Sequence, residues 1–137
     1  MTNPLLDTTS SQAAVGTNDA AIAGSENKPL ISYHDFSRLD IRLGTIESVT
    51  VVPEADKLLC LQVNCGEGSP RQIVSAIREF FADPQELVGK QCPFLVNLEP
   101  RKIRGLESQG MILAADIPGT FALLEPHPAL PPGTPVH

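Results

Sequence analysis

The sequence has little that points to a membrane or to an aromatic binding platform. It contains no tryptophan, and aromatic residues make up 4% of its 137 residues. No apolar run is long enough to cross a bilayer. The N-terminus lacks the basic start of a signal peptide, because the first cation is Lys28. We therefore expect a cytoplasmic protein that does not associate with membranes.

Catalytic and cofactor motifs are also missing. The P-loop, GxGxxG, HExxH and paired-cysteine zinc patterns do not occur. The run at 105–110, GLESQG, has one residue too many between its first glycine and the serine for GxSxG. The three histidines lie before the first expected strand and in the C-terminal arm, where no motif places them near a serine. We expect no enzyme activity, no catalytic residue, no bound metal and no cofactor.

The three cysteines, Cys60, Cys65 and Cys92, lie inside apolar, strand-like runs. Cys60 and Cys65 are five residues apart, so a strand would point them to opposite faces. That geometry suits neither a zinc site nor a shared disulfide. We expect buried thiols in a reducing compartment.

The first 29 residues differ in composition from the rest. They are rich in Thr, Ser, Ala, Asn and Gly and contain no aromatic residue. Such a segment cannot bury enough apolar surface to offset the entropy of ordering. We predict a disordered tail or linker at residues 1–29, and a single domain at residues 30–137.

Alternating apolar and polar residues predict strands at residues 39–51 and 59–65, and runs of strand-like residues predict three more at 71–77, 91–98 and 111–115. Gly44 falls where the alternation of the first strand changes phase, which predicts a bulge or a sharp coil of the strand there. The run Asp83-Pro84-Gln85-Glu86 predicts the start of a short helix between the third and fourth strands, and Gly89 predicts its end.

Residues 125–137 hold five prolines and predict an extended arm packed on the domain. Five strands with a helix between the third and fourth indicate an all-β OB-fold, a five-stranded barrel that binds oligonucleotides on one face. A small β-sandwich is the alternative, and the helical interruption argues against it.

A basic cluster stands out on an acidic chain. Arg101, Lys102 and Arg104 fall within four residues, with no acid between Pro100 and Leu106. The chain has a formal charge of −6, so removing these three cations would leave −9. Because Pro100 discourages helix and the glycines nearby permit turns, we predict an exposed loop between two strands that displays the cations for binding. The alternative is a solvated turn whose cations only confer solubility.

Four segments together resemble the tRNA-binding domain family: PEADKL at 53–58, RQIVSAI at 71–77, the block at 97–115 and PPGT at 131–134. That family occurs as free-standing bacterial tRNA-binding proteins, as the C-terminal part of bacterial methionyl-tRNA synthetases and in synthetase-associated cytokine-like proteins. The resemblance covers Tyr33 to His137. It implies an OB-fold that grips tRNA by shape and backbone with little reading of bases, usually as a homodimer.

The resemblance also implies which side chains face the RNA, and the basic cluster adds Arg104; the predicted tRNA-binding residues are Lys57, Arg71, Asn97, Arg101, Lys102, Arg104, Ser108 and Met111. Six of them have a structural alternative: a solvated turn for Lys57, an ion pair with Glu67 for Arg71, a loop cap for Asn97, an ion pair with Glu107 for Arg104, a bond to its own turn for Ser108 and a core position for Met111. The chain departs from the family at Val52, Ala76 and Glu99, where members often carry histidine, glycine and a cation.

The expected function is non-catalytic tRNA binding that supports aminoacylation, with tRNA, a second copy of the chain and a methionyl-tRNA synthetase as candidate partners. One alternative is a β subunit that acts in trans on a methionyl-tRNA synthetase as an accessory to that ligase. Another is a peptide-binding chaperone of the same superfamily. That chaperone lacks the ADKL and RQIVS patterns, so Lys57 and Arg71 favour tRNA binding.

Overall fold

The computed structural model describes residues 26–137, so most of the predicted tail lies outside the described part. Residues 31–115 and 121–137 form one compact unit. The elements, in chain order, are α1 (Tyr33–Ser37), β1 (Ile41–Val51), β2 (Leu59–Asn64), β3 (Arg71–Ser75), η3 (Arg78–Phe80), η4 (Pro84–Leu87), β4 (Gln91–Leu95), β5 (Arg101–Ile103), β6 (Leu106–Ser108), β7 (Met111–Ile112), β8 (Ala114–Ile117), β9 (Thr120–Leu123) and β10 (Pro135–Val136).

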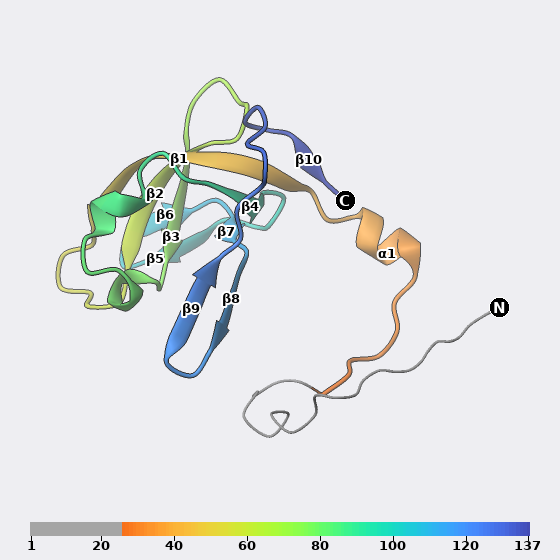
Figure 1. The fold of residues 1–137 in the computed structure, drawn as a ribbon, viewed down its shortest axis with the longest axis horizontal. Coiled ribbons are helices and arrows are strands. Elements are labelled where there is room, and N and C mark those ends of the chain that lie inside the picture. Colours follow the sequence, from red (N-terminus) through yellow and green to blue (C-terminus); the bar gives the residue numbers. More distant parts are fainter. Residues whose placement is uncertain (1–25) are drawn as a thin grey trace. The chain divides into compact units, whose positions relative to one another are not determined.

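The compact unit is built around a curved antiparallel sheet in the order β3–β2–β1–β4–β7, and β10 pairs with β1 (Figure 1). β1 is the central strand, because it pairs with β4 along residues 41–45 and with β2 along residues 45–51. The smaller hairpins β5–β6 and β8–β9 lie outside this order. The prediction of an all-β, OB-like barrel is confirmed, and the sheet is nearly closed.

Gly44 allows strands to approach closely at the centre of the barrel. A Cβ at this position would lie 2.5 Å from Val63 Cγ1 and 2.8 Å from Phe94 Cδ1. The bulge predicted there is misplaced, since the register between β1 and β2 shifts between Ile46 and Ser48. Gly44 therefore allows close packing of neighbouring strands, and the irregularity in strand pairing lies between Ile46 and Ser48.

Two groups of buried side chains form the interior. The larger includes Ile46, Leu61, Ile73 and Phe94 and fills the barrel. The smaller consists of Val52, Ala55, Cys60 and Val74, with Leu58, Ile103 and Leu106 packed against it; we call it the outer cluster. Cys60 lies in the outer cluster, whereas Cys65 and Cys92 lie in the barrel. The predictions of buried, unpaired thiols and of opposite faces for the first two are confirmed.

Two short 3₁₀ turns, η3 and η4, lie between β3 and β4, and η4 occupies the place of the predicted short helix. The predicted start is confirmed, because the Asp83 side chain accepts a hydrogen bond from Gln85 N at 3.1 Å and Pro84 takes the first position. Gly89 has a positive φ of 90° and follows the end of the turn. Its amide donates to Ile46 O of β1 at 2.8 Å, so the barrel takes a donor that a longer helix would use internally.

The predicted basic loop is a β-hairpin. β5 and β6 pair through a two-residue turn, Arg104-Gly105, whose φ angles of 53° and 82° are both positive. Asn-Gly is the usual sequence signature of such a turn. Because arginine replaces asparagine here, the sequence does not predict the turn. The strand predicted at 111–115 is also divided, into β7 and β8.

The extended C-terminal arm is confirmed. The Gln91 side chain donates to Leu130 O at 2.6 Å and accepts from Leu130 N at 3.0 Å. The arm then ends in β10, where Val136 pairs with Ile41 of β1. These bonds, two backbone hydrogen bonds between Leu43 and residues 133–134, and a short strand pairing thus fasten a segment that has little regular structure of its own.

Candidate nucleic-acid interface

The hairpin β5–β6 presents its cations in different directions. The register pairs Arg101 with Ser108 and Lys102 with Glu107. Because successive side chains of a strand point to opposite faces, Arg101 shares a face with Ile103, which packs in the outer cluster, and Lys102 lies on the other face. Arg104 occupies the turn. All three cations are exposed, and within the described residues none of them forms an ion pair.

The turn that carries Lys57 is attached to the same outer cluster. Its neighbour Leu58 packs there together with Ile103 and Leu106 of the hairpin. The Lys57 side chain is exposed, and in residues 26–137 it forms no ion pair. The outer cluster therefore links two segments that are more than forty residues apart in the sequence and both carry unpaired cations.

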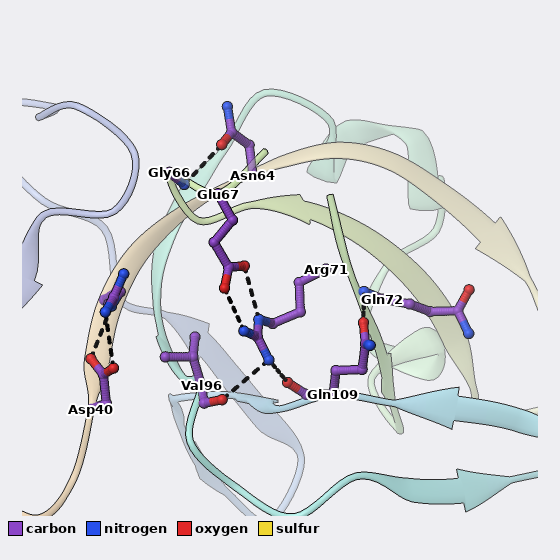
Figure 2. A network of polar contacts seen from close by, with 9 residues as sticks. Asp40, Asn64, Gly66, Glu67, Arg71, Gln72, Val96 and Gln109 are labelled. Carbon is purple, nitrogen blue, oxygen red and sulfur yellow. Dashed lines mark hydrogen bonds and ion pairs between the residues drawn. The ribbon is translucent and has the colours of Figure 1, made fainter. Parts of the chain in front are cut away.

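Arg71 is held by an internal network (Figure 2). Its Nε donates to Glu67 Oε1 at 3.1 Å, and its Nη1 donates to Val96 O at 3.2 Å and to Gln109 O at 2.8 Å. The hydrogen bond between the two side chains raises the pKa of Arg71 and lowers the pKa of Glu67. Arg71 thus joins the segments of Glu67, Val96 and Gln109. It also forms the ion pair with Glu67 that was the structural alternative to RNA binding.

Ser108 and Gln109, at the end of β6, bond to the free edge of β3. Ser108, only 5% exposed, accepts from Val74 N at 3.0 Å through its Oγ and donates to Gly110 O at 3.3 Å. Gln109 Oε1 accepts from Gln72 N at 3.0 Å, and Gln109 N donates to Gln72 O at 2.8 Å. We call this contact the seam. It satisfies edge groups that would otherwise be unpaired.

Gln72 and Gln109 were not among the residues predicted from the sequence. Each directly follows a predicted residue, Arg71 or Ser108, and that adjacency was the available signal. Gln72 Nε2 also donates to Glu107 O at 2.9 Å, so it adds a second bond between β3 and the hairpin. Both glutamines therefore position the basic hairpin.

Asn97 binds a distant part of the chain. Its Oδ1 accepts from Asp40 N at 2.9 Å, and its Nδ2 donates to Arg38 O at 2.8 Å. These bonds fix the connection between α1 and β1 to the end of β4. The amide does act as a cap, but for a segment nearly sixty residues earlier and not for its own loop.

Met111 lines a small pocket beside the hairpin. The pocket holds about 110 Å³ and is bounded by apolar side chains of Val74, Leu98, Ile103 and Met111. Met111 is 44% exposed, so it does not take the core position that was its structural alternative. The pocket lies between the end of β4, the hairpin and β7.

Comparisons with known proteins show the family of this chain. The family model described as "Putative tRNA binding domain" matches residues 41–135. The chain belongs to this tRNA-binding domain family. It is 41% identical to a methionine–tRNA ligase of Listeria monocytogenes over 124 residues, which is 90% of this chain and 18% of the ligase. The chain thus spans less than a fifth of that curated relative.

Solved structures agree on the fold. A MetRS-related protein from Pyrococcus horikoshii matches with a TM-score of 0.74 and 32% identity, over 80% of this chain and all of that one. The chaperone CsaA from Bacillus anthracis matches with a TM-score of 0.70 and 28% identity, over the same shares. Members of this fold thus include a synthetase-related protein and a chaperone.

Two further features of the described residues bear on function. In residues 26–137, no group of three or more His, Cys, Asp or Glu side chains is placed to hold a metal ion. The helices in the same range are also too short or too polar to span a bilayer.

Proposed function

We propose that the chain is a non-catalytic tRNA-binding protein of the cytoplasm that recognises tRNA mainly by shape and backbone contacts and supports aminoacylation. The observation that carries this proposal is the hairpin β5–β6, which exposes Arg101, Lys102 and Arg104 without internal partners on a chain of charge −6. Membership of the tRNA-binding domain family supports the same conclusion.

The predicted residues divide into two roles. Lys57 and the three hairpin cations contact phosphates directly, since their charges are exposed and unpaired in the described chain. Arg71, Asn97 and Ser108 act mainly by positioning, because their polar atoms already bond within the barrel. Met111 contacts the RNA through its exposed side chain.

A titration followed by fluorescence anisotropy tests the proposal. We expect total tRNA to bind more tightly than duplex DNA or single-stranded RNA of equal length. A plot of log affinity against log salt concentration should have the slope that roughly three to five phosphate contacts produce. Equal affinity for all three nucleic acids, or a slope near zero, would refute recognition of tRNA by shape and backbone.

We further propose a methionyl-tRNA synthetase as a partner, with this chain acting in trans as its β subunit. Similarity to the methionine–tRNA ligases supports this, because the chain matches a small part of each relative. Affinity purification from the native cell should recover such a synthetase with the chain. Recovery of tRNA without any synthetase would leave a free-standing tRNA-binding protein.

A peptide-binding chaperone is the second candidate, favoured by the match to CsaA. The two functions are separable by competition. We expect an unfolded polypeptide to be displaced by tRNA, or not to bind at all. A polypeptide that stays bound in the presence of saturating tRNA would favour the chaperone.

We also propose that the chain forms a homodimer with two-fold symmetry. α1 buries none of its residues; Tyr33, its first residue, is 79% exposed, and Ile31 just before it is 67% exposed. Leu130 and Val136 of the C-terminal arm are also exposed. Self-association is the common way to cover such residues. Sedimentation should show a dimer, and a monomer of 14.7 kDa at every concentration would contradict it.

A further inference from the structure

The pocket beside Met111 has a mainly apolar lining, whereas four other hollows of the described surface are lined mainly by polar groups. Leu98, Ile103, Met111 and the buried Val74 line it. Two charged residues, Glu99 and Arg101, also line it. Leu98 and Met111 remain 39% and 44% exposed, although both are large apolar side chains. The chain thus keeps an uncovered apolar site within its most basic segment.

The size and surroundings of this pocket restrict its occupant. A volume of about 110 Å³ is far below the several hundred Å³ of sites for larger organic ligands. An RNA base presents two apolar faces and a polar edge; proteins stack unstacked bases on aromatic rings or arginine planes, and enzymes that flip a base also hold it between apolar side chains. Arg101 lies in the wall of the pocket, so it can meet the phosphate attached to a base held there.

The carboxylate of Glu99 indicates which RNA base this pocket would hold. Within the described residues, its carboxylate forms no hydrogen bond or ion pair, so both oxygens are available as acceptors. Guanine is the base that offers two neighbouring N–H donors on its Watson–Crick edge, and a carboxylate accepts such a pair in a bidentate manner. Cytosine and adenine offer one amino group there, and uracil offers one imino group.

We propose that this pocket binds one unstacked guanine of the RNA, with Glu99 accepting from its Watson–Crick edge and Met111 packing on its face. The inference rests on the proposed function, because the hairpin must bring RNA to the pocket. It goes beyond that function, since it adds a base-specific contact to recognition by shape and backbone. Glu99 is then the residue that determines specificity.

The methionine methyl group provides a direct probe. The sequence has two methionines, Met1 and Met111, so protein labelled with ¹³C at the methionine methyl gives at most two assignable signals. The probes are the tetranucleotides UUGU, UUAU, UUCU and UUUU. We expect UUGU to shift the Met111 signal in a saturable way, with an affinity about 5- to 150-fold higher than the other three, as for a bidentate base contact.

Two matched variants assign the preference to the carboxylate. Glu99→Gln should reduce the preference for UUGU to less than about threefold, while tRNA binding retains its salt slope. Glu107→Gln removes the same charge from the other face of the hairpin and should leave the preference unchanged.

Three results would overturn the inference. The Met111 signal could stay in place with every tetranucleotide, it could shift equally with all four, or the guanine preference could persist in Glu99→Gln. If tRNA still binds with a normal salt slope in those cases, the proposed function stands and only the base pocket fails. If tRNA does not bind at all, both fail together.

Discussion

Replacing Arg101 and Lys102 together by alanine tests the central claim about the hairpin. The two side chains are adjacent in β5 and lie on opposite faces, so RNA that contacts both must wrap the hairpin edge. Neither side chain has an ionic partner within residues 26–137. The hairpin is attached through Ile103 and Leu106 in the outer cluster. The substitution should therefore remove RNA contacts and leave the fold intact.

The expected magnitude follows from counterion release. Each phosphate contact contributes about −0.7 to the log–log salt slope on single strands and about −0.9 on duplex regions. Losing two contacts should thus flatten the slope by about 1.4 to 1.8 units. With 1 M salt as the reference, the same exponents predict an affinity about 25- to 60-fold lower at 0.1 M salt, or roughly 1.9 to 2.4 kcal/mol.

Anisotropy titrations with total tRNA at four salt concentrations measure the slope, and urea denaturation measures stability. The free energy of unfolding should change by less than about 0.5 kcal/mol. Lys90→Ala is the matched control, since it removes one cation next to the opposite end of β4, where Lys90 Nζ lies 3.9 Å from Glu125. It should keep the parent slope. A double variant with the parent slope and affinity would show that the hairpin does not meet the RNA.

Three other predictions concern the barrel. Gly44→Ala should lower the free energy of unfolding by about 1–3 kcal/mol, because its Cβ would lie 2.5 Å from Val63; an unchanged urea midpoint would contradict this. Asn97→Ala should speed amide exchange in α1 and cost about 0.5–1.5 kcal/mol per lost bond, and faster exchange throughout the barrel would argue against so local a role. Burial raises the pKa of Cys92 to about 11, so Ellman's reagent at pH 8 should reach this thiol only after unfolding, and rapid reaction of the native protein would show that it is accessible.

The sequence by itself determined the barrel and the location of its basic segment. The strand-like runs at residues 59–65 and 71–77 predicted β2 and β3, and both strands bury side chains on each of their faces. Asp83 and Pro84 marked the start of η4, since capping depends on residues that are neighbours in the chain. The cluster at 101–104 was visible for the same reason: charge density is a local property.

Only the tertiary structure decided what several polar side chains do. Arg71 and Ser108 are residue types that often contact RNA. In the structure, however, Arg71 bonds to Val96 and Gln109, and Ser108 bonds to Val74 and Gly110. Those partners depend on how the barrel closes. The same holds for the positive φ of Arg104, because the pairing of β5 with β6 imposes it.

The pocket beside Met111 also arises only in three dimensions. β4, the hairpin and β7 meet there, and an apolar residue such as Leu98 looks like part of a core until its 39% exposure is known. The sequence neighbours of a side chain are fixed, but its possible partners in the folded chain are many. Which partner it takes is decided by the long-range packing that folding brings about, and no local pattern records that choice.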